Sequence, residues 1–256
     1  MSNNTVLKAT NLCKTFQMSK KNTYEVLKNI NMEIREGEFV SVMGPSGSGK
    51  STLLYNVSSM DRATSGSVVF DGKELSQCSE AELSDLRLRE MGFIFQDILL
   101  LKNLCLVDNI VVSAFLSKDK NREEVRQYAG QLMKMTGIAD IKENDITQAS
   151  GGQLQRVGIC RALVNHPKII FGDEPTGALN SRATAEIMEI LTEINRGGST
   201  IMLVTHDARV AARTERVLYM CDGTIKSEKV LGKFEKGMDL GQREETLSQW
   251  LRSRGF

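Results

Sequence analysis

Short apolar runs alternate along this chain with stretches in which apolar residues recur every three or four positions. Short runs are typical of buried strands, whereas a recurrence of three or four marks one face of a helix. The predicted strands cover residues 39–43, 68–70, 93–95, 169–171, 201–204 and 217–220. Because such strands alternate with helices, the pattern predicts a largely parallel sheet with helices packed against it.

One helix is well defined by its apolar positions. Its buried face is formed by residues at i, i+3, i+4 and i+7, which are Ile187, Ile190, Leu191 and Ile194. We expect the helix to end at the glycine pair 197–198, because glycine commonly follows the last helical turn.

Between residues 97 and 150 the strand pattern gives way to helical periodicity. One helical stripe consists of Val125, Ala129, Leu132 and Thr136. We expect Asn121 to cap the start of this helix and Gly137 to end it. Upstream, the sequence Ser79-Glu-Ala-Glu82 predicts a short helix opened by a capping box. Proline-rich linkers are absent from the sequence, so the insertion should pack on the core as a subdomain.

The C-terminal segment 232–256 is more strongly charged than the rest of the chain. Leu247, Trp250 and Leu251 would share one apolar face of a short terminal helix. We interpret this as a helix packed on its own domain, and docking of a partner protein is the alternative.

Composition and charge narrow the class of protein. The 256 residues are 41% hydrophobic and 25% charged, a balance that excludes collagen-like, disordered and coiled-coil chains. Lys and Arg number 33 against 32 for Asp and Glu, so the chain has almost no net charge to attract nucleic acid or an anionic lipid surface. We therefore expect no nucleic-acid partner.

The five cysteines and two histidines lack the spacing of a metal site. No C-x-x-C pair occurs, and His166 lies far from His206 in the sequence, which excludes a zinc finger. An odd cysteine count fits a reducing cytoplasm, where thiols mostly act as small buried apolar groups.

Neither a secretory signal nor a membrane span is predicted. The N-terminus is polar, and a signal would need a basic, then apolar, then small-residue order. The longest uncharged apolar runs, such as 98–101 and 201–204, fall far short of the roughly 18 residues that cross a bilayer. Work at a membrane would therefore require a partner.

A phosphate-binding loop follows the first buried strand. Residues 44–51 read Gly-Pro-Ser-Gly-Ser-Gly-Lys-Ser and fit the pattern G-x-x-x-x-G-K-[ST] between a strand and a helix. Backbone N–H groups and the helix N-terminus can hold phosphate oxygens, Lys50 can reach the β- and γ-phosphates, and Ser51 can bind Mg²⁺. A chance flexible loop is the alternative, which the flanking elements disfavour. The predicted nucleotide-binding residues here are Gly44, Pro45, Ser46, Gly47, Ser48, Gly49, Lys50, Ser51 and Thr52.

Two adjacent carboxylates end the apolar strand that begins at residue 169. Asp173 is expected to hold Mg²⁺. Glu174, one position further on, can act as the general base that deprotonates the attacking water. Taken alone, an apolar strand that ends in Asp-Glu is explained equally well by a solvated strand end.

A third motif supplies the context that a generic phosphate-loop enzyme lacks. Ser150, Gly151, Gly152 and Gln153, followed by Gln-Arg at 155–156, resemble the signature sequence of ABC transporter ATPases. The characteristic motifs of that family occur in the usual order over residues 5 to 228, about nine tenths of the chain. The resemblance implies ATP and Mg²⁺ as ligands and ATP hydrolysis as the activity.

The resemblance also assigns roles to three further residues. Phe16 would stack on adenine, Gln96 would contact the metal and the attacking water, and His206 would hydrogen-bond the γ-phosphate. The alternatives are a core aromatic for Phe16 and a structural histidine for His206. His166, which precedes a proline in a turn, keeps the structural interpretation.

By the same resemblance the active unit is a homodimer. The signature glycines and Ser150 can hold phosphate at a helix start, but they lie about 100 residues beyond Lys50. In the family two copies stack head to tail, so that each ATP lies between the Lys50 loop of one copy and the Ser150 segment of the other.

The fold implied by the resemblance is the α/β fold of the ABC ATPases among the phosphate-loop NTPases. It has a mixed, mostly parallel sheet core, an antiparallel β subdomain and an inserted α-helical subdomain. We expect one nucleotide-binding domain over 1–256, with a catalytic core at 5–96 and 157–231. A helical subdomain with the signature would occupy 97–156, and a C-terminal extension 232–256.

Three positions depart from the family pattern. Ala149 stands where leucine is usual, and Gly172 replaces an apolar residue or alanine before the metal aspartate. Both should preserve hydrolysis. Asn180 stands where the family has aspartate, in a loop that connects the two sites of the dimer, which puts the coupling between them in doubt.

Within the family, the sequence most resembles the transporters for bacitracin-type antimicrobial-peptide resistance and sensing. This resemblance rests on residues 177–181, 210–218 and 250–256. It implies a permease of many spans, at times with a sensor histidine kinase, at the cytoplasmic face of a bacterial membrane. A cytoplasmic helix of the permease would dock near Gln96 and the leucines of 98–101.

Other functions stay open at this stage. Lipoprotein-release and macrolide-export ATPases are similar within the family. A non-transport ATPase acting on ribosomes or DNA is a second alternative. An ATP-gated clamp that barely hydrolyses is a third, and Glu174 argues against it.

Overall fold

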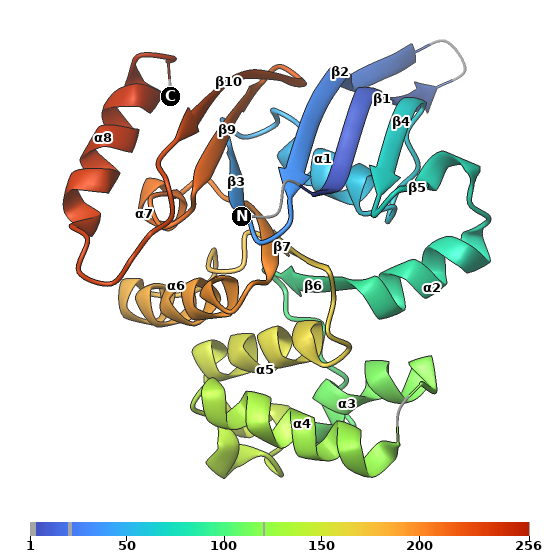
Figure 1. Ribbon diagram of the computed structural model, residues 1–256, viewed down its shortest axis with the longest axis vertical. Coiled ribbons are helices and arrows are strands. Elements are labelled where there is room, and N and C mark those ends of the chain that lie inside the picture. The colour runs from blue at the N-terminus through green and yellow to red at the C-terminus, as the bar shows by residue number, and fades with distance from the viewer. Residues whose placement is uncertain (1–3, 20–21, 120, 256) are drawn as a thin grey trace.

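The computed structural model describes residues 4–19, 22–119 and 121–255, which form two sheets and a lower group of helices (Figure 1). The strands are β1 (Thr5–Ser19), β2 (Asn22–Arg35), β3 (Phe39–Met43), β4 (Ser65–Phe70), β5 (Lys73–Glu74), β6 (Met91–Phe95), β7 (Ile169–Asp173), β8 (Thr200–Val204), β9 (Arg216–Cys221) and β10 (Thr224–Val230). The α-helices are α1 (Lys50–Val57), α2 (Glu80–Glu90), α3 (Leu106–Ser117), α4 (Arg122–Met135), α5 (Gly151–Leu163), α6 (Ser181–Arg196), α7 (Ala208–Ala211) and α8 (Leu240–Arg252). Short 3₁₀ turns occupy Leu75–Gln77, Ala139–Ile141 and Ile146–Gln148.

The six-stranded sheet has the order β10-β9-β3-β8-β7-β6, and only the β9–β10 pair in it is antiparallel. Its central strands β3 and β8 are buried along their whole length, as expected for a parallel sheet that is covered on both faces. The second sheet, β2-β1-β4-β5, is antiparallel throughout. The predicted α/β fold, with a mostly parallel core and an antiparallel β subdomain, is confirmed.

The two faces of the parallel sheet belong to different cores. On one face, residues such as Val42 and Phe171 pack with α1 and the antiparallel sheet. On the other, residues such as Ile170 and Leu203 pack with α5, α6 and the helices of the lower subdomain. Because the sheet lies between these two cores, the strands that lead to the turns at its carboxyl edge are packed on both faces.

The helix boundaries follow from their caps. Ser79 forms the predicted capping box with Glu82 at the start of α2, and Asn121 accepts a hydrogen bond from Glu123 N at the start of α4. Gly137, with φ of 71°, follows the last turn of α4 as predicted. α6 ends at Gly197, also as predicted.

The lower subdomain consists of α3 and α4 with the adjoining part of α5 (Figure 1). The proposed boundary at residue 157 falls inside α5, which runs without a break from Gly151 to Leu163. The signature segment is therefore continuous with a helix that packs against strand β6 of the core.

The C-terminal helix α8 packs on its own domain, as predicted. Leu247 and Leu251 are buried in a third apolar cluster with Met43, Ala211 and other residues of the parallel sheet's β9 side. Among the described residues, no helix is both long enough and apolar enough to cross a membrane.

Candidate active site

The phosphate loop connects β3 to α1 through glycines that the backbone requires. A Cβ on Gly44 would lie 1.9 Å from the carbonyl oxygen of Met220, so only glycine fits against strand β9. Gly49 precedes α1 with φ of 97°, a left-handed conformation that glycine adopts without strain. The loop is therefore held open as a cradle for phosphate oxygens.

Lys50 is the cation of this cradle. Its Nζ donates to the carbonyl oxygens of Gly44 at 3.0 Å and Pro45 at 2.9 Å. Burial lowers the pKa of Lys50, and the carboxylates of Glu174 and Asp173 oppose that shift. A phosphate group would add further negative charge near Nζ and so favour the charged ammonium.

Asp173, at the end of β7, is fixed by two residues of α1. Ser51 Oγ donates to Oδ1 at 2.8 Å, and the Tyr55 hydroxyl donates to Oδ2 at 2.7 Å. Burial, followed by the hydrogen bond to Asp173, raises the pKa of Tyr55 to about 12. Both oxygens of the carboxylate are therefore oriented toward the first turns of α1.

Tyr55 was not anticipated from the sequence. Its spacing of four residues from Ser51 was the available signal, because i and i+4 side chains lie on the same helix face. In the sequence, however, Tyr55 stands among apolar residues and reads as a core aromatic.

The Ser51 and Asp173 oxygens suit Mg²⁺, which prefers hard oxygen ligands and is usually held by one or two carboxylates together with substrate phosphates. Within the described ranges no cluster of three or more His, Cys, Asp or Glu side chains could hold a metal alone.

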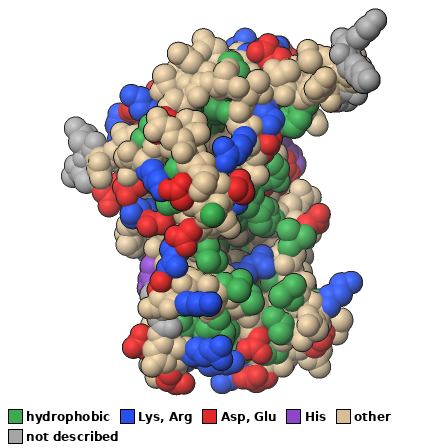
Figure 2. Space-filling model, turned by 90° about the vertical axis from the view of Figure 1, so that its right-hand side faces the viewer, with side chains coloured by type: hydrophobic (Ala, Val, Ile, Leu, Met, Phe, Trp, Pro, Cys, Tyr) green, Lys and Arg blue, Asp and Glu red, His purple; other side chains and the backbone are tan. Residues whose placement is uncertain are grey.

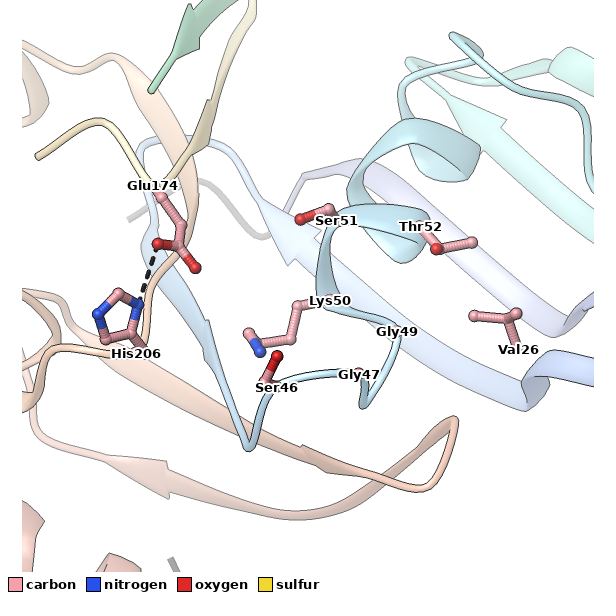
Figure 3. Close-up of a pocket in the computed structure, with 9 residues that line it drawn as sticks. All are labelled: Val26, Ser46, Gly47, Gly49, Lys50, Ser51, Thr52, Glu174 and His206. Carbon is pink, nitrogen blue, oxygen red and sulfur yellow. Dashed lines mark ion pairs between the residues drawn. The ribbon is translucent and has the colours of Figure 1, made fainter. Parts of the chain in front are cut away.

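Glu174 and His206 meet across the carboxyl edge of the sheet (Figure 3). His206 Nδ1 lies 3.0 Å from Glu174 Oε2, and Glu174 N donates to the carbonyl oxygen of Val204 at the end of β8. Glu174 has φ of 46°, which is uncommon for a non-glycine residue and typical of a functional position. His206 and the proposed base Glu174 therefore lie within hydrogen-bonding distance at this edge of the sheet.

Gln96 approaches the same carboxylate from the end of β6. A Cβ on Gly177 would lie 3.2 Å from Gln96 Nε2 and 3.3 Å from Glu174 Oε2, so the amide and the carboxylate flank one small space. Gly177 thus leaves room for both groups. The roles assigned to Gln96, Glu174 and His206 remain predictions that this arrangement supports.

These residues surround a cavity of about 620 Å³ (Figure 3). Glu174 and His206 form one wall, and Lys50 and Ser46 on the loop face them. The cavity is lined by Val26, Ser46, Gly47, Gly49, Lys50, Ser51, Thr52, Glu174 and His206. Val26, which sequence reasoning did not single out, comes from β2 of the antiparallel sheet.

Phe16 lies on β1 and is 40% exposed, with Lys14 Nζ 4.8 Å above its ring. The alternative of a buried core aromatic does not fit this exposure. Its predicted stacking on adenine remains a prediction, because Phe16 is not among the residues that line the cavity.

The signature segment opens α5, as predicted, and forms a separate cavity of about 440 Å³. Ser150 caps the helix by accepting a hydrogen bond from Gln153 N at 3.3 Å, and Gln153 Oε1 accepts one from Ser150 N at 2.8 Å. Gly152, Arg156 and Asn180 also line this cavity. It shares no lining residue with the cavity at Lys50.

The three departures from the family pattern have local explanations. Asn180 Oδ1 accepts from Ala183 N at 2.9 Å and so caps α6. A Cβ on Gly172 would lie 2.3 Å from Leu203 Cδ2, so Leu203 fills the space that a larger residue would need. Ala149 still packs, partly buried, on the core beneath the signature.

His166 and two of the five cysteines have the structural surroundings expected of them, whereas Cys13, Cys105 and Cys221 are only partly buried. The His166 ring stacks on Tyr128 with 4.2 Å between centroids. Cys78 and Cys160 are buried, and burial raises the pKa of Cys160 to about 12, which keeps this thiol protonated at neutral pH.

A family model described as ABC transporter matches residues 27–177. The lipoprotein-releasing system ATP-binding protein LolD 1 of Chlorobium chlorochromatii is 39% identical over 229 residues, 89% of this chain and 93% of the relative. The macrolide export ATP-binding/permease protein MacB of Mannheimia succiniciproducens is 44% identical over 80% of this chain but only 32% of its own length. A dimeric ATP-binding cassette of Methanocaldococcus jannaschii, solved in a post-hydrolysis state with ADP and Pi, is 39% identical with a TM-score of 0.82, covering 89% of this chain and all of that one.

Proposed function

Because the chain belongs to the ABC transporter family and is an ATPase, we propose that it drives a membrane permease as a homodimer. The observation that carries this proposal is the separation of the two phosphate-binding surfaces. The hydrolytic side chains line the cavity at Lys50, whereas Ser150 and Gly152 line another. In the proposed dimer the second surface would be supplied to the ATP by another copy.

Each residue of the site has a defined task in hydrolysis. Lys50 and the loop amides bind the phosphates, while Ser51 and Asp173 would hold Mg²⁺, which neutralises phosphate charge when bound. Glu174 would accept a proton from the attacking water, a contribution typically worth about a hundred- to ten-thousandfold in rate. His206 would orient Glu174 and donate to the γ-phosphate.

An exposed apolar patch beside the site fits a permease helix. Leu99 is 67% exposed and Leu101 49% exposed, and both follow Gln96 closely in sequence. Next to them Phe93, Phe95 and other residues line a groove of about 250 Å³. Figure 2 shows hydrophobic side chains gathered on this face between the upper and lower halves of the molecule. Exposed apolar patches commonly mark protein interfaces.

The permease we favour belongs to the bacitracin-type antimicrobial-peptide systems, at the cytoplasmic face of a bacterial membrane. The sequence resemblance at 177–181, 210–218 and 250–256 supports this choice. Such a system could include a sensor histidine kinase as a further partner. Lipoprotein release or macrolide export is the second candidate, favoured by relatives that are 39% and 44% identical.

Purification of the tagged chain from gently solubilised membranes, followed by mass spectrometry, tests both candidates. A permease of many spans with a large extracellular domain supports the peptide system, and a permease of few spans supports the second candidate. Ribosomes or nucleic acid without a membrane protein would overturn the transport proposal.

Matched variants test the docking patch in the same experiment. Leu99→Asp should lose the permease, because a charge at the centre of an apolar interface is costly to desolvate. Met238→Asp places the same charge on an exposed apolar residue of the C-terminal segment and should retain it. Retention of the permease by Leu99→Asp would contradict the proposed docking site.

A further inference from the structure

Arg243, in the first turn of α8, binds four backbone carbonyls at once. Its Nε donates to Ala212 at 2.8 Å and its Nη1 to Leu231 at 2.8 Å. Its Nη2 donates to Thr214 at 3.0 Å and Gly232 at 2.9 Å. A guanidinium has five N–H donors in a rigid plane, so this one side chain joins two separate turns in a fixed geometry.

One of these turns directly follows α7, the short helix next to His206. α7 is a single helical turn that begins two residues after His206, ends at Ala211 and has Ala212 as its C-cap. Asp207 caps its start by accepting from Arg209 N at 2.8 Å. An isolated turn of helix is unstable by itself, so α7 depends on what holds its two ends. Asp207 holds the first end. At the second end Arg243 acts together with Thr214, whose hydroxyl donates to the Ala211 carbonyl at 2.8 Å.

The body of α8 packs against two segments that adjoin the residues of the catalytic cavity. Leu247 and Leu251 share one buried cluster with Ala211 of α7 and with Met43. Met43 ends β3 and directly precedes the phosphate loop. α8 therefore packs against the segment that follows His206 and the strand that leads to Lys50.

The far end of α8 is anchored as well. Arg254 Nε donates to Ser227 Oγ at 2.8 Å, and the Tyr219 hydroxyl donates to the Arg254 carbonyl at 3.3 Å. The Trp250 ring meets Tyr219 edge-on at 6.2 Å between centroids. Figure 1 shows α8 lying alongside α7 and β10. With both ends fixed, α8 can resist displacement of α7.

We infer that Arg243 is a positioning residue for ATP hydrolysis, because it holds the segment after α7 and thereby keeps His206 beside Glu174. This inference rests on the catalytic roles proposed above for those two residues. The phosphate loop has its own support from β3 and β9, so nucleotide binding should not depend on Arg243. Its loss should reduce the rate of hydrolysis and leave ATP affinity largely unchanged.

Three variants of the full chain test the inference. Arg243→Ala should lower kcat about tenfold with KM for ATP changed less than about twofold. Arg243→Lys keeps the charge but presents a single nitrogen, so its kcat should fall between those of wild type and Arg243→Ala. Arg252→Ala, on the same helix, removes only an exposed ion pair with Glu245 and should behave as wild type.

A double-mutant cycle separates positioning from general support. If Arg243 acts through His206, Arg243→Ala should have little further effect on kcat in the His206→Ala background. An equal effect in both backgrounds, or a rise in KM with kcat intact, would overturn the inference.

Hydrogen exchange gives a readout that does not require turnover. In Arg243→Ala without nucleotide, amides of residues 206–214 should exchange faster while those of 44–51 stay protected. Unchanged exchange at 206–214 would count against the inference. Absence of ATP turnover in the wild-type chain would instead count against the proposed function, and the exchange measurement would still stand.

Discussion

The cavity at Lys50 and the cavity at Ser150 each lie at the glycine-containing N-terminus of a helix, yet their side chains differ. The Lys50 cavity is lined by a cation and by a carboxylate paired with a histidine, and its Ser51 hydroxyl donates to the nearby carboxylate of Asp173. In the Ser150 cavity the capping serine and Gln153 bind each other's backbone. The first holds the proposed catalytic pair, whereas the second combines a helix N-terminus with the side chains of Arg156 and Asn180.

This difference indicates a division of labour between two copies. A helix N-terminus can bind a phosphate through N–H groups and its dipole without any catalytic side chain. The Ser150 surface can therefore close over an ATP that the Lys50 surface of another copy already holds. Hydrolysis would then depend on both surfaces, whereas initial binding would depend on one.

Glu174→Gln should give the largest effect, because it removes the proposed base while nearly preserving shape. We expect kcat for ATP to fall about a hundred- to ten-thousandfold, as measured by phosphate release. ATP binding should persist, since the loop and Lys50 are intact. Light scattering with ATP should then show a longer-lived dimer. An unchanged rate would remove Glu174 from its assigned role.

Mixing two inactive variants tests most directly whether the two cavities act on the same ATP. Lys50→Ala disables one surface and Ser150→Ala the other, and a mixed dimer retains one site with both surfaces intact. We expect partial recovery of ATPase activity on mixing, with no recovery when either variant is doubled in amount. If the mixture stays inactive while mixed dimers form, the two surfaces do not share one ATP.

Much of this arrangement could be predicted from the sequence, because its signals are local. The strand 39–43, the loop 44–51 and the cap at Ser150 each depend on neighbouring residues, and all three appear where expected. The placement of Asp173 and His206 at one edge of the sheet could also be predicted, because parallel strands have their carboxyl ends at the same edge.

The residues that were missed depend on contacts between distant segments. Tyr55 reaches Asp173 across 118 positions of sequence, and Val26 enters the cavity from the other sheet. The role inferred for Arg243 likewise depends on its hydrogen bonds to the turns at 212–214 and 231–232. The residue types alone carry no sign of these partners.

Tyr55→Phe should have an intermediate effect on the Mg²⁺ requirement and tests whether the Tyr55 hydroxyl orients Asp173. The hydroxyl is one of two donors to Asp173, and a hydrogen bond to a charged group typically contributes about 1.5–3 kcal/mol. We expect roughly a tenfold higher Mg²⁺ concentration for half-maximal ATPase activity. Tyr24→Phe, at an exposed position of β2, is the control and should leave the Mg²⁺ requirement unchanged.

The same residue gives a pH-dependent effect on stability. The pKa of Tyr55 is raised to about 12 in the folded protein, whereas an unfolded tyrosine titrates near about 10. The folded state therefore binds this proton more tightly, and the stabilisation is complete below pH 10 and is lost as pH rises toward 12. The difference in urea-unfolding free energy between wild type and Tyr55→Phe should shrink from pH 9 to pH 11. A constant difference would contradict the assignment, since other tyrosines are common to both proteins.

The smallest effect is expected at the Ser150 cavity, from Asn180→Asp. Asn180 caps α6 through Oδ1, and aspartate caps helices about as well as asparagine, so the free energy of unfolding should change by less than about 0.5 kcal/mol. Asn180→Ala, the matched control, removes the cap and should cost about 1 kcal/mol. Asn180 also lines the Ser150 cavity, which in the proposed dimer would close over the ATP held by the other copy. Asn180→Asp should therefore alter the ATP-concentration dependence of hydrolysis without this loss of stability. An unaltered dependence would mean that the residue serves α6 alone, and that the two sites communicate through other contacts.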